Sequence, residues 1–286
     1  MAQIANQPQA DFWTSPAGRA WLDHEQALDA TMERLLRPLL DAADLGGSED
    51  ILDVGCGTGA STLAAARRVP RGTVLGLDIA APMLDRARQR AQAEGVANVV
   101  FHLCDAQVER LAPDSRDVMI SRFGMSFFDD SVAAFRNLSQ ALRDGGRMVF
   151  LSWARLADNP WFTIPEKAAR DWLNTPPEPP TNGPGPLAFA DADHALDLMA
   201  RAGLVEGRVE TLQIDLTPPG GSSGAARLAT HVGPAARLLR ICNATPQDRE
   251  QIAARIQGEF SAFGQGDDLR IPSAVHLFSC HARRQA

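Results

Sequence analysis

The sequence predicts an α/β fold whose mostly parallel, doubly wound sheet carries helices on both faces. Two observations predict this class. Short apolar runs rich in β-branched residues alternate with segments of helical periodicity from residue 51 to residue 153. The first run enters a glycine-rich turn and then an alanine-rich helix former, which is the strand–turn–helix order of a parallel sheet. Because ligands of such sheets bind beyond the carboxyl ends of the strands, we expect the site there.

The first unit begins with an apolar strand at Ile51 and continues into a turn with glycine at every second position. Gly55, Gly57 and Gly59 allow the backbone to fold tightly and bring a ligand against bare main chain. Residues 60–68 form the next helix, whose N-terminal amides point at whatever the turn holds. This order predicts a nucleotide-type site.

The glycine spacing allows two interpretations. Gly55, Gly57 and Ala60 satisfy the dinucleotide fingerprint, in which alanine can replace the third glycine. Asp53 favours a different ligand, because a carboxylate here repels a pyrophosphate and attracts a cationic amino group. S-adenosylmethionine (SAM) carries such a group on its methionine portion.

The later strands also end in acids. A strand over 73–78 ends in Asp78, whose carboxylate can accept hydrogen bonds from two ribose hydroxyls. Because NAD needs the same group, Asp78 supports a ribose under both interpretations. A strand over 98–106 carries Asp105 near its end. Further strands are expected over 117–123, 147–153, 208–216 and 271–280, and further helices over 81–94, 132–143 and 191–202.

The acid-first spacing of Asp53, Gly55, Gly57 and Gly59 resembles the first motif of class I SAM-dependent methyltransferases. Over residues 45–155 the chain is similar to the bacterial small-molecule methyltransferases related to the ubiquinone/menaquinone C-methyltransferases. The resemblance implies a Rossmann-like sheet of seven strands, six parallel and the last antiparallel. It also implies SAM as cofactor and S-adenosylhomocysteine (SAH) as product.

The resemblance further implies a role for each strand end. The methionine portion is expected at Asp53 and the glycine turn, the ribose at Asp78, and the adenine amino group at Asp105 with the backbone of Ala106. For Arg122 two roles stay open, a contact with the cofactor carboxylate or an ion pair with a nearby acid. The expected cofactor-binding residues are Asp53, Gly55, Cys56, Gly57, Thr58, Gly59, Asp78, Ile79, Met83, Asp105, Ala106, Ser121, Arg122 and Phe123.

Segments outside the core are expected to enclose the methyl acceptor. We expect an N-terminal helical lid over 1–44, the core over 45–216 with a proline- and glycine-rich loop at 175–186, a helical cap over 217–270, and the last strand and C-terminus over 271–286. The cap is expected to hold two helices, over 225–243 and 246–263. The expected substrate-binding residues are Phe12, Trp13, Met125, Phe127, Trp153 and Trp161.

The chemistry of methyl transfer makes a catalytic base optional. A sulfonium is already a reactive donor, and in-line positioning alone supplies roughly 7–11 kcal/mol of barrier reduction. Aromatic faces add about 0.5–2 kcal/mol for a cation, although Trp153 is equally explained by core packing. We name no catalytic base, but His24 and His231 are the two histidines placed to overhang the site, whereas His102 and His276 are expected to be structural.

Composition excludes several classes of function. The net charge of −7 argues against nucleic acid, because binding to the phosphate backbone requires a basic face. The chain has no tyrosine, which excludes a phenolic base and the tyrosine-ending motif of base-modifying methyltransferases. Its four scattered cysteines show no metal-ligand spacing, so no metal is expected. With no signal-peptide pattern and no apolar run of about 18 residues, we expect a cytoplasmic protein without a membrane span, able to form a homodimer.

The sequence therefore predicts a SAM-dependent methyltransferase acting on an oxygen, nitrogen or carbon nucleophile of a small organic acceptor. A NAD-dependent oxidoreductase is the first alternative, but it leaves Asp53 and Asp105 without roles. A non-catalytic SAM-binding protein is the second, because no base can be named.

Overall fold

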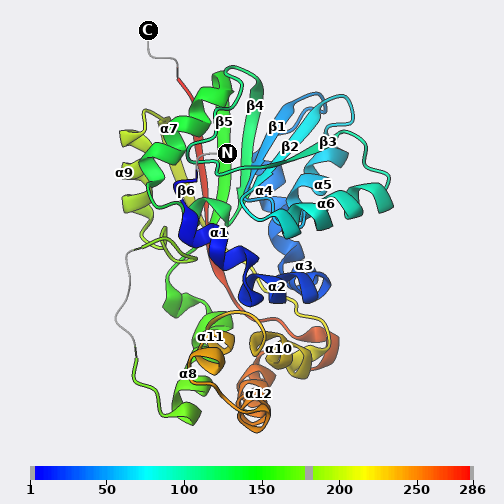
Figure 1. The fold of residues 1–286 in the computed structure, drawn as a ribbon, viewed down its shortest axis with the longest axis vertical. Helices are drawn as coiled ribbons and strands as arrows, with labels where there is room; N and C mark the ends of the chain where they lie inside the picture. The colour runs from blue at the N-terminus through cyan, green and yellow to red at the C-terminus, as the bar shows by residue number, and fades with distance from the viewer. Residues whose placement is uncertain (1–3, 178–182, 284–286) are drawn as a thin grey trace.

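The computed structural model describes residues 4–177 and 183–283. In the described chain, seven strands form one sheet in the order β3-β2-β1-β4-β5-β7-β6 (Figure 1). Strands β1 to β5 pair in parallel, and β7 lies antiparallel between β5 and β6. The strands are β1 (Asp50–Val54), β2 (Thr73–Asp78), β3 (Val99–Leu103), β4 (Arg116–Arg122), β5 (Leu142–Trp153), β6 (Val205–Gln213) and β7 (Ala274–His281). The expected sheet, with only its last strand antiparallel, is confirmed.

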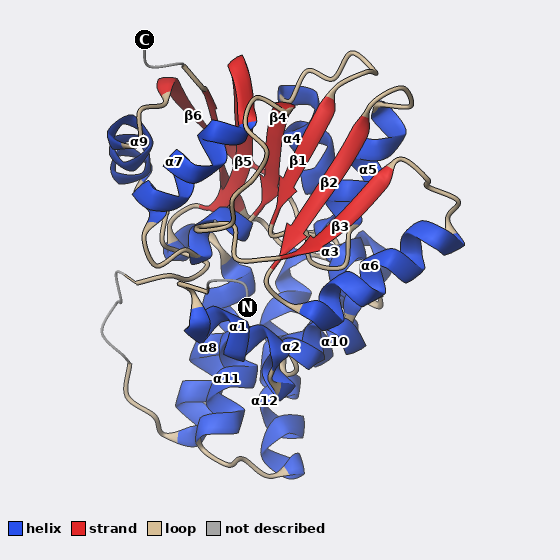
Figure 2. Cartoon of the chain, turned by 45° about the horizontal axis from the view of Figure 1, so that its top comes forward, coloured by secondary structure: helices blue, strands red, loops and turns tan. Residues whose placement is uncertain are grey.

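Helices cover both faces of this sheet, as the doubly wound prediction requires (Figure 2). Along β1, Ile51 belongs to the apolar cluster beneath α4, whereas Leu52 and Val54 belong to the cluster beneath α7 and α9. This alternation follows from the two-residue period of a strand, and burial on both faces explains why the strands read as continuous apolar runs. The core helices are α4 (Leu36–Ala42), α5 (Ala60–Arg68), α6 (Ala81–Ala93), α7 (Ser131–Ala141) and α9 (Ala192–Arg201).

A second helical layer lies beyond the carboxyl ends of the parallel strands (Figure 1). It consists of α8 (Pro160–Leu173), α10 (Gly221–Ala229), α11 (Pro234–Ile241) and α12 (Pro246–Phe260). Between this layer and the sheet lie the N-terminal helices α1 (Gln7–Thr14), α2 (Pro16–Asp23) and α3 (Glu25–Met32).

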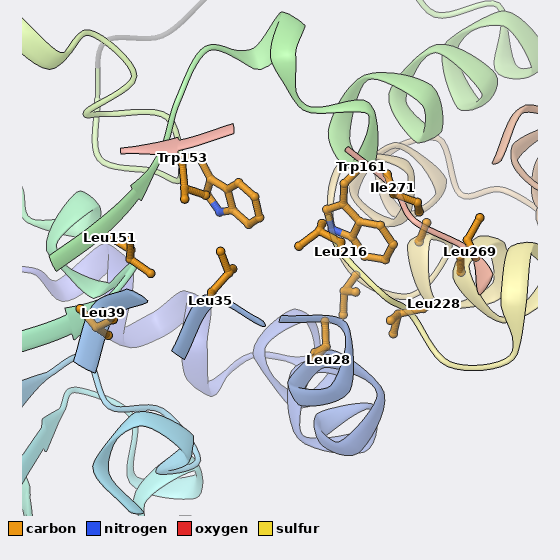
Figure 3. Close-up of a cluster of buried hydrophobic side chains, with 14 of the residues drawn as sticks. Leu28, Leu35, Leu39, Leu151, Trp153, Trp161, Leu216, Leu228, Leu269 and Ile271 are labelled. Carbon is orange, nitrogen blue, oxygen red and sulfur yellow. The ribbon is translucent and has the colours of Figure 1, made fainter. Parts of the chain in front are cut away.

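One apolar cluster runs from the sheet through the N-terminal segment into the second layer (Figure 3). Leu151 and Trp153 come from β5, Leu28 from α3, and Trp161 and Leu228 from the second layer. Since these side chains share one buried cluster, the N-terminal helices and the second layer are packed onto the core as part of the same fold.

Two expectations about the second layer need correction. The single helix predicted over 225–243 is two helices, because Gly233 has φ 88° and ψ −161° and is followed by Pro234, which begins α11. In addition, α8 packs against α11 and α12, so the helical layer includes a segment that the prediction assigned to the core. Of the predicted loop at 175–186, residues 178–182 lie outside the described residues, and its other residues form neither helix nor strand.

Candidate cofactor and substrate site

A cavity of about 1940 Å³ opens where the sheet, the N-terminal helices and the second helical layer meet. Ligand pockets usually measure about 300–1000 Å³, so this space is large enough for a cofactor and a second molecule together. Of the expected site residues, the wall includes Phe12, Trp13, Gly55, Cys56, Gly57, Thr58, Asp78, Ile79, Met83, Asp105, Ala106, Arg122, Phe123, Phe127, Trp153 and Trp161.

Four expected site residues, Asp53, Gly59, Ser121 and Met125, are absent from the described wall. Met125 is fully buried in the cluster beneath α7, and the hydroxyl of Ser121 donates to the carbonyl oxygen of Val54 at 2.6 Å. Gly59 caps α5 with φ 88° and packs on the side chains of α6 and β3. Asp53 lies beneath the turn with no exposed surface.

The glycine turn is shaped by close backbone contacts. A Cβ atom on Gly55 would lie 2.7 Å from the Cα of Gly124, so the ends of β1 and β4 approach as closely as two glycines allow. Gly57 differs, because a Cβ atom there would meet no atom within 4 Å although its φ is +55°. Gly57 is on the cavity wall, so bare backbone faces open space where a ligand can approach.

The carboxylate of Asp53 is held from one side only. Its Oδ2 accepts hydrogen bonds from the hydroxyls of Ser61 at 2.7 Å and Thr62 at 2.6 Å, whereas its Oδ1 is buried without a partner among the described residues. Burial raises the pKa of Asp53 to about 6, against the lowering effects of the two hydroxyls and of Arg122. A buried acceptor without a partner is costly and calls for a compensating positive group.

Arg122, at the end of β4, makes one of the two contacts that the sequence left open. Its Nη2 donates to Oδ1 of Asp29 at 3.1 Å, which is the ion pair with a nearby acid. Its Nη1 is buried without a partner among the described residues, and the side chain is on the cavity wall. One donor of the guanidinium therefore stays available for an anion in the cavity.

Asp78, at the end of β2, is held in place but not saturated. Its Oδ2 accepts from the backbone N–H of Gly57 at 2.8 Å and its Oδ1 from that of Ala80 at 2.9 Å. Each carboxylate oxygen can accept a second hydrogen bond, so the wall offers acceptors for two hydroxyls. Burial raises the pKa of Asp78 above its usual value.

Asp105 has different partners from those expected. Its oxygens accept from the backbone N–H groups of Ala5, Asn6 and Gln107 and from Nδ2 of Asn6, at 2.8–3.0 Å. These four donors occupy both oxygens, so in this structure Asp105 anchors the N-terminal segment. An adenine amino group could bond to this carboxylate only in place of one of them.

Aromatic side chains from several elements line the cavity. Trp13 makes edge contacts with Phe12, Trp21 and Phe127, at ring-centroid distances of 5.2, 5.5 and 5.7 Å. Phe123 stacks on Trp153 at 4.5 Å and holds a left-handed backbone with φ 72°. A bulky residue in this conformation is strained, and such strain concentrates at functional sites.

The two histidines singled out from the sequence meet in the structure. The ring centroids of His24 and His231 are 4.6 Å apart, and His231 is on the cavity wall. His276 is also on the wall, but its ring nitrogens contact the hydroxyl of Thr211 at 2.9 Å and the carbonyl oxygen of Ala190 at 3.2 Å. His276 is therefore a satisfied structural residue, as expected.

A group of three residues bears on the expectation that no metal binds. Among the described residues, one donor from each of His102, Cys104 and Glu109 lies within 4.8 Å of the others. Burial raises the pKa of the Cys104 thiol to about 12, so this ligand is protonated at neutral pH. Binding would require loss of that proton, and we assign no metal to the group.

Sequence reasoning missed an ion-pair network that joins α3 to the site. Glu25 is 2.6 Å from Arg86, and Asp29 is 2.7 Å from Arg90, which also donates to the Thr58 hydroxyl at 3.1 Å. The signal was present in the sequence, because two acids four residues apart on one helix match two arginines four residues apart on another.

Comparisons with known proteins agree with the resemblance noted from the sequence. Residues 51–146 match the family model described as a methyltransferase domain. The aklanonic acid methyltransferase DauC of Streptomyces sp. strain C5 is 34% identical over 117 residues, covering 41% of this chain and 53% of the relative. The nocamycin O-methyltransferase of Saccharothrix syringae is 33% identical over 153 residues, covering 52% of this chain and 51% of the relative. The chain thus spans about half the length of these curated relatives.

Solved structures show the same fold at low sequence identity. The YcgJ protein of Bacillus subtilis has a TM-score of 0.55 and 16% identity, covering 88% of this chain and 100% of that one. Phosphoethanolamine N-methyltransferase 2 of Haemonchus contortus, solved with SAH, has a TM-score of 0.53 and 16% identity, covering 88% of this chain and 53% of that one. Over residues 51–146 the chain thus matches the methyltransferase domain family, within a sheet of the order β3-β2-β1-β4-β5-β7-β6.

Proposed function

We propose that the protein transfers a methyl group from SAM to an oxygen, nitrogen or carbon nucleophile of a small organic acceptor. The observation that carries the proposal is a pair of buried, oppositely charged groups beside the glycine turn, Asp53 and Arg122, each with one atom that has no partner in the described part of the chain. The methionine portion of SAM ends in an ammonium and a carboxylate, so it supplies the two complementary charges. Arg122 lies on the wall and binds the carboxylate of SAM. Asp53 lies beneath the turn and attracts the ammonium through its charge.

The rest of the wall supports the same ligand. Asp78 offers acceptors for two ribose hydroxyls, and the open space over Gly57 admits a ligand against the backbone. For the adenine, Ile79, Met83 and Ala106 remain on the wall, whereas the Asp105 carboxylate is occupied by the N-terminal segment. We therefore assign adenine to the apolar side chains of this wall and to the backbone of Ala106.

The NAD alternative fits the turn less well. Asp53 lies beneath the turn with a carboxylate oxygen that has no partner among the described residues, and its negative charge would repel a pyrophosphate bound above it. The names of the sequence relatives also favour methyl transfer, since they include two small-molecule methyltransferases. A turnover assay distinguishes the methyltransferase from a non-catalytic SAM-binding protein, because only the enzyme forms SAH and a methylated product.

When bound, SAM supplies an electrophilic methyl group, and the protein must hold the acceptor in line and keep water away. Trp13, Phe123 and Trp153 give the wall an aromatic character suited to a sulfonium. The cavity volume leaves room for an acceptor beside the cofactor. Among the helices of residues 4–177 and 183–283, none combines the length and apolar character needed to span a bilayer. The homodimer and the cytoplasmic location stay predictions.

Titration calorimetry with SAH tests the proposal directly. Asp78→Ala removes two charge-assisted hydrogen bonds to the ribose, so its dissociation constant for SAH should rise by about 100-fold or more. His102→Gln, an exposed change on β3 away from the cavity wall, should bind like the wild type. Thermal denaturation with NADH in parallel completes the test. Stabilisation by NADH but not by SAH or SAM would overturn the proposal.

A further inference from the structure

We propose that His231 is a general base that removes the proton of an acceptor hydroxyl, with His24 positioning its ring. This inference rests on the proposed function and narrows its acceptor to a hydroxyl-bearing molecule, such as a phenol or an enol. A carboxylate acceptor is already ionised at neutral pH and needs no base.

The two rings come from different layers of the molecule. His24 lies between α2 and α3, and His231 follows α10. Their centroids are 4.6 Å apart with an angle of 54° between the planes, and both side chains are half-buried. His24 therefore limits the orientations open to His231 at the junction of the N-terminal helices and the second helical layer.

One hydrogen bond fixes which nitrogen of His231 is free. Its Nδ1 lies 2.8 Å from the carbonyl oxygen of Arg227, one helical turn earlier. A carbonyl oxygen only accepts, so Nδ1 carries the hydrogen and Nε2 of the neutral ring keeps its lone pair. Nε2 of His231 can therefore accept a proton. The cavity wall that includes His231 also includes the apolar side chains of Val232 and Leu238.

The surroundings favour the uncharged pair. Burial lowers the pKa of His24, and His231 and Arg227 lower it further, against the opposing effect of Asp23. Two imidazolium rings at this distance would also repel each other. The lowered pKa of His24 therefore favours a neutral ring beside His231.

The chemical step balances with these groups alone. The O–H bond of the acceptor breaks as its proton moves to Nε2 of His231, and an oxygen electron pair forms the new bond to the methyl carbon. The bond between that carbon and sulfur breaks, and its electron pair stays on sulfur to give neutral SAH. The imidazolium then releases the proton to solvent. General-base assistance of this kind typically contributes about 10²–10⁴-fold in rate.

The first test needs no acceptor. In nitrogen-15 NMR of the SAH complex, His231 should show the tautomer with hydrogen on Nδ1. The opposite tautomer would overturn the proposal, because Nε2 could not then accept the proton.

The second test uses hydroxyanthraquinones and simple phenols as probes, with benzoic acid as a carboxylate control, and detects methyl uptake by mass spectrometry. The wild type should methylate a phenolic probe at a rate that rises with pH. His231→Gln should lower kcat at least 100-fold at pH 7 and bind SAH within about twofold of the wild type. Its activity should recover at the high pH where the phenol ionises by itself.

Two matched variants complete this design. His24→Ala should reduce kcat less than His231→Gln and change the nitrogen-15 signals of His231, because the neighbouring ring that limits its orientation is lost. His102→Gln should leave the rate and its profile unchanged. Equal kcat in His231→Gln and the wild type would overturn the proposal, and so would methylation of benzoic acid without any phenol. SAH binding by the wild type separates these outcomes from failure of the proposed function.

Discussion

Asn6 donates a hydrogen bond from Nδ2 to Oδ1 of Asp105 at 2.8 Å and thereby fastens the N-terminal segment to the chain just after β3. The same amide reaches the side-chain oxygen of Gln107 and accepts from the backbone N–H of Asp129. Only 3% of Asn6 is exposed, so these hydrogen bonds are shielded from water. Because Asn6 and Asp105 are both on the cavity wall, this contact closes one side of the site.

Loss of the Asn6 amide should loosen the N-terminal helices. Asn6→Ala leaves buried partners unsatisfied, so it should lower the free energy of unfolding by about 1–3 kcal/mol. It should also speed proteolytic cleavage within residues 7–32, as followed by mass spectrometry. Gln7→Ala is the control, because Gln7 is exposed and, among the described residues, its side-chain amide donates to Asp11, one turn along α1. Equal cleavage rates in the two variants would show that Asn6 does not hold this segment.

The buried carboxylate of Asp53 should make the ligand-free protein less stable as pH rises. Its pKa is about 6 in the folded protein, above the usual 3.8, so the folded state binds the proton more tightly between about pH 4 and pH 6. Stability without ligand therefore falls as pH rises through that window. Asp53→Asn should remove the Asp53 contribution to this dependence, leaving that of Asp78, and raise stability at pH 7 by up to about 3 kcal/mol, since one pKa unit equals about 1.4 kcal/mol.

The same variant should bind SAH more weakly. In the wild type, affinity should rise with pH through about 6, because the ionised carboxylate attracts the ammonium of the ligand. Asp78 adds to this trend, since burial raises its pKa as well. Asp53→Asn should raise the dissociation constant by about tenfold, or about 1.4 kcal/mol. Melting curves across pH, with and without SAH, measure both effects; a variant that is neither more stable nor weaker in binding would contradict the role given to Asp53.

Gly57→Ala should harm ligand binding more than folding. The added methyl group meets no protein atom within 4 Å and projects into space at the cavity wall, and the strain at φ +55° costs about 1 kcal/mol. Gly145→Ala is a matched control, because Gly145 has φ +73°, equally open space, and no place on the wall. Calorimetry should show weakened SAH binding only in Gly57→Ala, while both variants lose similar stability. Equal SAH affinity in Gly57→Ala and Gly145→Ala would show that the ligand does not bind against Gly57.

Much of the sheet was predictable, because each parallel strand carries its own local signal. The apolar runs before Asp78 and Arg122 are rich in β-branched residues and buried on both faces. Each run therefore predicts a strand without knowledge of the strands that pair with it. The place of β7 between β5 and β6 was different. It depends on pairing across the sheet and was available only through the resemblance to a known family.

The site residues show the same difference between local sequence signals and long-range packing. Asp78 and Arg122 end their strands and Gly57 lies just after β1, so strand order alone brought them to one edge of the sheet. Asn6 and Asp29 reach the site from the N-terminal segment, and no local pattern reports where a distant helix will pack. Met125 failed as a predicted wall residue for a related reason, since the short helical turn after β4 directs its side chain into the core.

Gly18 should tolerate no side chain, because α1 and α2 meet at its Cα. A Cβ atom there would lie 2.1 Å from the backbone oxygen of Trp13, far inside van der Waals contact. Gly18→Ala must therefore push α1 away, and with it Trp13 from its edge contact with Phe127. We expect a loss of about 1–3 kcal/mol in unfolding free energy and a change in tryptophan fluorescence.

For Gly258→Ala we expect the opposite effect on the free energy of unfolding. Gly258 lies in α12, and a Cβ atom there meets nothing within 4 Å. Replacing a helical glycine by alanine reduces the entropy lost on folding, so this variant should gain about 0.5–1 kcal/mol. Chemical denaturation monitored by circular dichroism compares the two variants. If both alanines changed stability in the same direction, the close approach of α2 to Trp13 would not be what requires glycine at position 18.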